Sequence, residues 1–137
     1  MKAISLFLLR LSTGIYLMLW GFMKLGAKEK AVGLSDKYYD GLLSGDIVNY
    51  SVGAAEMLIG LLVVLGLFRG VAYLGQLAFY LVGAAAIIAD LVDPFALYLA
   101  DTPHLLFFPS WTLLFASLVV IAFKSEDTLS LDAKRSA

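Results

Sequence analysis

Residues 53–70 read GAAEMLIGLLVVLGLFRG, and this stretch decides the fold. It is almost wholly apolar, yet Glu56 stands several residues inside its N-terminal end. On insertion scales, an ionised side chain at the centre of a membrane span costs roughly 2.5–3.5 kcal/mol, so such a residue normally has a partner or a function. The surroundings of Glu56 are therefore the main question that the sequence raises.

The composition indicates an integral membrane protein. Of the 137 residues, 61% are hydrophobic and only 15% are charged, whereas soluble domains are about 45–50% apolar and about 25% charged. The formal net charge of −1 provides no basic surface for nucleic acid. Because the chain has no cysteine, thiol redox chemistry, disulfides and iron–sulfur ligation within it are excluded.

Four apolar runs are long enough to cross a hydrocarbon core, which takes about 20 residues of helix. They cover residues 4–24, 50–68, 71–92 and 103–123. The second and third runs together are about twice as long as a bilayer is thick, so we expect a tight helical hairpin with its turn at Arg69-Gly70. The predicted fold class is all-α, a transmembrane four-helix bundle with antiparallel, up-and-down helices in residues 1–124. Residues 125–137 are predicted to form a short, polar and mobile tail.

The connecting segments leave alternatives open. The polar first loop, residues 26–49, carries apolar residues at near-helical spacing: Leu34, Tyr38, Tyr39, Leu42 and Leu43. This pattern is typical of a short amphipathic helix on the membrane surface with its tyrosines at headgroup level, although a solvated loop fits equally well. The apolar loop at residues 93–102 is expected to lie in the interface or fold over the bundle.

Two prolines mark the start of the fourth span. Thr102-Pro103 is typical of an N-cap followed by proline at the first helical position. Pro109 then falls inside the helix and predicts a bend there, or a displaced first turn, because proline has no N–H to donate.

The distribution of positive charge slightly favours cytoplasmic termini. With four spans, one side of the membrane collects Lys2, Arg69, Lys124, Lys134 and Arg135. The other side holds Lys24, Lys28, Lys30 and Lys37. Because Lys and Arg are enriched in cytoplasmic loops, we predict that both termini of this integral membrane protein are cytoplasmic. Arg10, expected to snorkel toward the N-terminal side or to contact lipid phosphate, adds to this bias.

Helical geometry places the polar and small residues of each span on one face, at about 100° per residue. These faces hold Arg10, Gly14, Leu17, Gly21 and Lys24 in the first span, Gly53, Glu56, Gly60, Val64 and Leu67 in the second, and Phe79, Gly83, Ala86 and Asp90, with Gln76 at the edge, in the third. In lipid, small residues allow close helix contact, and polar residues face the bundle. The sequence therefore predicts a compact bundle.

Depth along the spans sorts the polar residues into two layers. Arg10 and Gln76 form a predicted structural layer toward the termini. The candidate ligand-binding or proton-handling residues lie toward the opposite side and are Glu56, Lys24, Asp90, His104 and Tyr16. No catalytic triad, phosphate-binding loop or metal-ligand cluster is recognisable, so we assign no catalytic residue and no metal.

Two interpretations of Glu56 follow. In the first, it is the floor of a polar pocket that opens toward the loop side, with Tyr16, Trp20 or Trp111 as walls. In the second, it pairs with Lys24 and only holds the helices together. His104 likewise has an ordinary interpretation, as a loop or capping histidine.

Three motifs, in this order and spacing, resemble those of the DoxX family of small four-helix membrane proteins. They are Leu9-Arg10-Leu-Ser-Thr-Gly14, Gly21-Phe-Met-Lys24, and Glu56-Met-Leu-Ile-Gly60 followed by Gly66-Leu-Phe-Arg69. They cover the first three predicted spans, while the fourth matches only as a hydrophobic helix. The resemblance implies a bundle in a bacterial-type inner membrane and work linked to quinones or to oxidative stress.

Two functions from different classes follow from the residues and the resemblance together. The first is a quinone- or small-lipophile-binding membrane subunit of an oxidoreductase or oxidative-stress system, with quinone as the possible cofactor and a redox protein as partner. The second is a non-catalytic, chaperone-like assembly or interaction protein, because a distant relative of the family is a receptor-assembly chaperone. Membrane lipid is a partner in both, nucleic acid in neither, and an oligomer is compatible with both.

Overall fold

The computed structural model describes residues 1–41 and 45–136, and for residues 28, 31, 34 and 136 it describes the backbone only. Over these residues the chain is helical and contains no strand, which confirms the all-α prediction. Three described stretches are long and apolar enough to cross a membrane: α1 (Lys2–Gly26), α3 (Asp46–Leu65) and Leu105–Ala122, which joins the 3-10 helix η1 (Leu105–Phe107) to α6 (Ser110–Ala122). A fourth long helix, α4 (Arg69–Ala86), packs on both α3 and α6.

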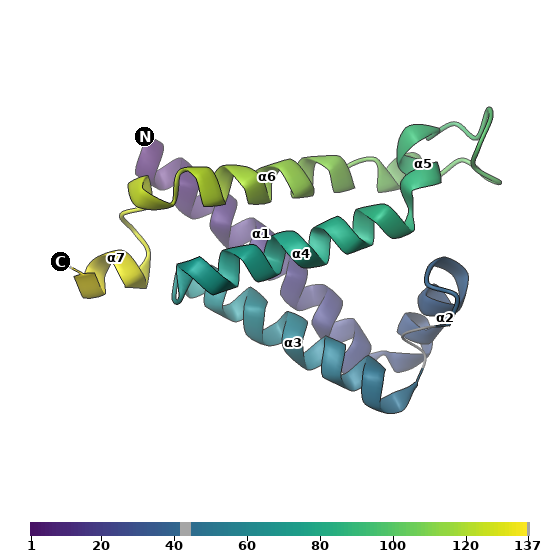
Figure 1. The fold of residues 1–137 in the computed structure, drawn as a ribbon, viewed down its shortest axis with the longest axis horizontal. Helices are drawn as coiled ribbons and strands as arrows, with labels where there is room; N and C mark the ends of the chain where they lie inside the picture. The colour runs from purple at the N-terminus through teal and green to yellow at the C-terminus, as the bar shows by residue number, and fades with distance from the viewer. Residues whose placement is uncertain (42–44, 137) are drawn as a thin grey trace.

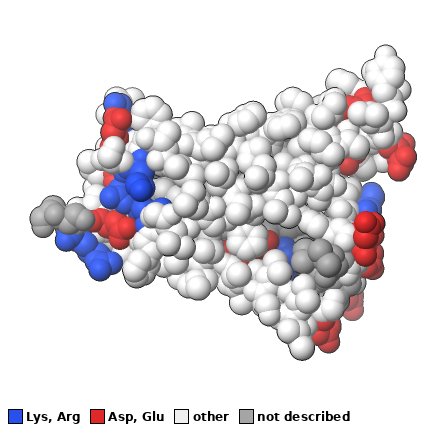
Figure 2. Space-filling view, in the orientation of Figure 1, with Lys and Arg blue, Asp and Glu red and all other residues white. Residues whose placement is uncertain are grey.

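The ends of the helices gather in two groups (Figure 1). Both termini, the α3–α4 turn and α7 (Leu131–Ser136) lie at one end of the molecule, and α2 (Lys28–Tyr38) and α5 (Ile88–Val92) lie at the other. Figure 2 shows the Lys, Arg, Asp and Glu side chains mainly at these two ends, with little charge between them. An uncharged middle with charged ends is the distribution that a lipid bilayer requires.

Helices α1 and α3 make the closest contact between long helices, through glycines. A Cβ atom on Gly21 of α1 would lie 2.7 Å from the carbonyl oxygen of Gly53 and 2.8 Å from the backbone nitrogen of Met57. A Cβ on Gly60 of α3 would lie 2.8 Å from the carbonyl oxygen of Gly14. Small residues thus let the two backbones touch, and the predicted small-residue faces of the first two spans are confirmed.

We expect Gly21→Ala to destabilise the protein by about 1–3 kcal/mol, because the backbones of α1 and α3 must separate to admit the methyl group. Gly70→Ala is the matched control, since a Cβ at Gly70 meets nothing within 4 Å. Alanine is the better helix former by about 1 kcal/mol, so the control is expected to be neutral or stabilising. Unfolding in mixed detergent measures both variants, and an equal effect in the two would contradict the contact.

The turn between α3 and α4 lies at residues 66–68, earlier in the chain than predicted. Gly66 adopts a left-handed conformation with φ 71°, and its N–H donates to the carbonyl of Val63 at 3.1 Å. This is a glycine-terminated helix end, so Arg69 and Gly70 already belong to α4. The backbone N–H of Arg69 donates to Oδ2 of Asp132 at 2.9 Å, and this distant carboxylate fixes the start of α4.

The third predicted span, residues 71–92, is not one helix. It breaks at Ile87 between α4 and α5. The buried face of α4 comprises Ala72, Tyr73, Gln76, Tyr80 and Ala84, so Gln76 lies at the centre of that face rather than at its edge. Because the break changes the direction of the chain, residues on its two sides cannot share one helical face, and Asp90 is buried through α5.

The start of the fourth span also differs from its prediction. The N-cap at Thr102 is wrong: the α-helix begins at Ser110, and η1 precedes it. The expected disturbance at Pro109 takes the form of a displaced first turn. A proline has no N–H to donate and fits the beginning of an α-helix; here its carbonyl accepts the N–H of Leu113 at 3.1 Å.

The C-terminal residues fold back onto the bundle, which corrects the prediction of a mobile tail. After the 3-10 helix η2 (Lys124–Glu126), Asp127 is only 2% exposed. Its Oδ2 lies 2.8 Å from Nε of Arg10 and accepts the Tyr73 hydroxyl at 3.0 Å. Arg10 is only 1% exposed and also donates to the carbonyl of Val63 at 2.9 Å. The snorkelling prediction for Arg10 is therefore wrong, because its counterion comes from the tail.

Gln76 completes the polar layer near the termini. Its Nε2 donates to the hydroxyls of Thr13 at 3.1 Å and Ser117 at 3.4 Å, and so joins α1, α4 and α6. Interhelical hydrogen bonds of this kind stabilise membrane bundles by about 0.6 kcal/mol each on average. This geometry fits the structural role that the sequence predicts for Gln76.

Candidate functional site

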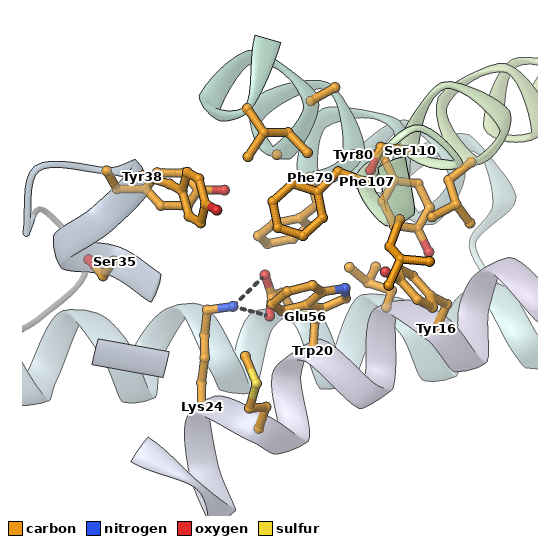
Figure 3. A pocket seen from close by; sticks show the side chains of 18 residues that line it. Tyr16, Trp20, Lys24, Ser35, Tyr38, Glu56, Phe79, Tyr80, Phe107 and Ser110 are labelled. Atoms are coloured by element: carbon orange, nitrogen blue, oxygen red, sulfur yellow. Dashed lines mark hydrogen bonds and ion pairs between the residues drawn. The ribbon is translucent and has the colours of Figure 1, made fainter. Parts of the chain in front are cut away.

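A cavity of about 310 Å³ lies at the end of the bundle that carries α2 (Figure 3). Side chains of α1, α2, α3, α4, η1 and α6 line it. Its described lining includes the aromatic residues Tyr16, Trp20, Tyr38, Tyr39, Phe79, Tyr80 and Phe107. The remaining described lining residues are Leu17, Met23, Lys24, Ser35, Glu56, Gly83, Ala84, Ile87, Leu106, Ser110 and Leu113.

An ion pair between α1 and α3 supplies the charged groups in the described lining of the cavity. Nζ of Lys24 lies 2.9 Å from Oε2 and 3.1 Å from Oε1 of Glu56, and both residues are buried. The Lys24 ammonium also lies 5.6 Å from the centre of the Trp20 ring, within the range of a cation–π contact. Figure 3 shows the two charged groups pointing toward each other, with Trp20 beside Glu56.

The glycine contact of α1 and α3 explains why these charges meet. Gly21 and Gly53 each stand one helical turn before a member of the pair, so their close approach brings Lys24 and Glu56 together. A Cβ on Gly53 would lie 2.8 Å from the Cβ of Lys24. In addition, Nδ2 of Asn49 donates to the backbone carbonyl of Lys24 at 2.8 Å and ties the end of α1 to α3.

The predicted contact of Glu56 with Lys24 is therefore confirmed, and Tyr16 and Trp20 line the cavity as expected. Trp111 is not among the described lining residues, and its indole N–H donates to the carbonyl of Leu91 at 3.3 Å. The sequence pattern did not indicate the other aromatic residues that line the cavity, which are Tyr38, Tyr39, Phe79, Tyr80 and Phe107. Phe79 shares a predicted face with Gly83, which gave a partial signal for α4.

Asp90 and His104 form a second pair that does not reach the cavity. Nδ1 of His104 lies 2.8 Å from Oδ1 of Asp90. The His104 ring stacks on Phe107 at 4.9 Å between centroids, and Phe107 in turn lines the cavity. The pair thus stands behind an aromatic wall, where it holds η1 against α5.

Helix α2 closes part of the cavity, and this favours the amphipathic-helix interpretation of the first loop. Ser35 is buried, and the Tyr38 ring meets Phe107 edge-on at 5.8 Å. Tyr38 and Tyr39 both line the cavity. The other apolar positions of the predicted pattern, Leu42 and Leu43 and the side chain of Leu34, lie outside the described residues.

Tyr39 is a hydrogen-bond donor at physiological pH. Burial raises the pKa of its phenol, and the nearby Glu56 carboxylate raises the pKa further. The hydroxyl of Tyr80, by contrast, already donates to the backbone carbonyl of Thr13. Lys24 and Tyr39 are thus two of the lining residues that can donate a hydrogen bond to an acceptor in the cavity.

Beyond the cavity, Asp93 organises the loop that follows α5. Its carboxylate accepts the backbone N–H groups of residues 97–100 at 2.6–3.3 Å. These hydrogen bonds lower the pKa of the Asp93 carboxyl from 3.8 to about 2, and those from Leu99 and Tyr98 contribute most. The stabilisation is present above pH 3.8 and is lost as the pH falls through about 2. Phe95, Tyr98 and their apolar neighbours stay exposed, so the loop does not fold over the bundle.

Comparison with known proteins places the chain in a family. The DoxX family profile matches residues 5–91, which run from α1 to α5 and include the Lys24–Glu56 pair. Searches of curated proteins and of solved structures found no match. Because the profile covers more than half of the sequence and the three described stretches can cross a membrane, this chain is a membrane protein that belongs to the DoxX family.

Proposed function

We propose that this protein binds a small lipophilic molecule of the quinone class in the cavity beside Lys24 and Glu56. The observation that carries the proposal is an aromatic-lined cavity whose described charged lining residues, Lys24 and Glu56, neutralise each other. Aromatic walls favour a flat ring through offset or edge-on stacking. Ligand cavities of this kind often lie between bundle helices and carry a few convergent polar groups.

The charges of the cavity favour an uncharged ligand. An ionised head would leave one charge without a counterion in a buried place, which is costly. A quinone carbonyl is neutral and accepts hydrogen bonds, and the Lys24 ammonium and the Tyr39 phenol donate them. The residues present therefore fit a quinone ring.

We further propose that α1, α3, α4 and α6 form a four-span antiparallel bundle in the plasma (inner) membrane, with cytoplasmic termini. The gathering of both termini and the α3–α4 turn at one end supports this arrangement. In this arrangement, the protein serves as the membrane subunit of an oxidoreductase or oxidative-stress system. Because the chain has no cysteine, a thiol step in such a system would belong to a partner protein.

A filled cavity tests the proposal. Gly83 lines the cavity, and a Cβ there would meet only the Tyr39 hydroxyl, at 3.9 Å. We expect Gly83→Leu to occupy the cavity and to abolish binding of decylubiquinone in native mass spectrometry, while the protein stays folded. Gly70→Leu, which points into open space, should bind like wild type. Unchanged binding by Gly83→Leu would contradict the proposal.

A second candidate function is a non-catalytic assembly protein. The observation that favours it is the loop after α5, where Asp93 fixes the backbone and Phe95, Leu97, Tyr98 and Leu99 are exposed. A rigid apolar loop is suited to contact with a second membrane protein. In that case Gly83→Leu would keep every activity of the wild type, and polar substitutions in this loop would remove it.

A further inference from the structure

The size of the cavity limits how much of a ligand it can hold. Its volume of about 310 Å³ is at the lower end of the roughly 300–1,000 Å³ found for pockets that enclose drug-sized ligands. A ring with small substituents fits such a space, whereas a long apolar chain attached to the ring does not. A lipid-soluble ligand with a long apolar chain would therefore have to place that chain outside the cavity.

The exposure of the described lining residues indicates where the cavity meets the surface. Among the described lining residues, Leu106 and Tyr16 are the two that are exposed, at 91% and 37%. Tyr16 is the less exposed of the two, and its ring packs against Trp20 at 6.3 Å and Tyr80 at 6.2 Å between centroids. Leu106, in η1, lines the cavity and is also almost fully exposed to the surface. We therefore take Leu106 as the position of the mouth of the cavity.

The surface around Leu106 is suited to lipid. Leu105 and Phe108 next to it are also exposed and apolar. All three lie at the start of the stretch Leu105–Ala122, which is apolar and long enough to cross a membrane. On the other side of the mouth, the contact of Tyr38 with Phe107 joins α2 to η1. The path out of the cavity thus runs over Leu106 toward the acyl chains.

We infer that the ligand is a tailed amphiphile: its uncharged ring occupies the cavity, and its apolar chain leaves over Leu106 into the lipid. This inference rests on the proposed function and adds the class of ligand and its direction of entry. A chain lying on Leu106 gains apolar contact there without having to fit inside the cavity. The ring makes its contacts with the aromatic walls and the ion pair, and these do not involve Leu106.

Two ligands and two variants distinguish the contribution of the apolar chain to binding from that of the ring. The ligands are decylubiquinone and the same benzoquinone ring without its decyl chain, measured against protein in nanodiscs of fixed lipid composition. The variants are Leu106→Asn and its control Leu97→Asn, which changes a leucine that is 68% exposed and outside the described cavity lining. Both positions are on the surface, so we expect both variants to melt like wild type.

We expect Leu106→Asn to weaken decylubiquinone binding about fivefold, a change of about 1 kcal/mol, and to leave the affinity for the tailless ring unchanged. Leu97→Asn should affect neither ligand. If Leu106→Asn changes both affinities equally, or neither of them, the inference is overturned while the proposed function stands. If neither ligand binds the wild type at all, it is the proposed function that fails, and the inference fails with it.

Discussion

Asp127→Ala is expected to cost about 3–5 kcal/mol of stability, because it leaves the Arg10 guanidinium buried without its counterion. The two groups are 2.8 Å apart, and both are almost wholly inaccessible. The substitution also removes the acceptor of the Tyr73 hydroxyl. Arg10 cannot give up its proton, so it must either stay charged in the core or pull the end of α1 toward water.

A neighbouring carboxylate provides the control. Glu126 pairs with Lys2, but the two side chains are 40% and 66% exposed, and exposed pairs contribute about 0.2–1 kcal/mol. Glu126→Gln should therefore have a small effect in the same detergent unfolding measurement. The double variant Arg10→Met with Asp127→Met should recover part of the loss, since apolar residues can replace a buried pair. A loss for Asp127→Ala as small as that for Glu126→Gln would show that Arg10 finds another partner.

Glu56→Leu should be the second most destabilising change and lower the free energy of unfolding by about 3 kcal/mol, because it leaves the buried Lys24 ammonium without a counterion. The cost falls at the lower end of the range for buried pairs because Lys24 borders the cavity. Glu56→Gln should lose less, since it keeps the shape of the side chain and an oxygen that accepts from Nζ of Lys24.

The same unfolding measurement checks the role of Lys24. Combining Glu56→Leu with Lys24→Met removes the stranded charge and should restore much of the stability. If Glu56→Leu alone were as stable as wild type, Lys24 would not need Glu56 as a counterion, and the ion pair would not contribute to the stability of the fold.

Features that depend on one helix and its depth could be predicted from the sequence. Periodicity placed Gly21 with Lys24 and Gly53 with Glu56, and antiparallel helices bring equal depths together. The meeting of Lys24 and Glu56 follows from these two facts. The family motifs cover the same residues, so the resemblance and the geometry point to the same place.

Features that depend on contacts between distant segments could not be predicted. Asp127 stands in a polar tail whose composition is typical of a mobile end, so nothing local marked it as the partner of Arg10. Asp132 fixes the start of α4 from the far end of the chain in the same way. For Tyr38 and Tyr39, an amphipathic pattern gives an apolar face but does not say whether lipid or a cavity covers it.

The most direct test of the central claim, that Glu56 and Lys24 form part of a ligand site, compares decylubiquinone binding by wild type, Glu56→Gln and the exposed control Glu126→Gln in nanodiscs. We predict that Glu56→Gln remains folded and binds about tenfold more weakly, a loss of about 1.4 kcal/mol, while Glu126→Gln binds like wild type. Binding by Glu56→Gln that equals wild type would contradict the account and leave the ion pair with a structural role alone.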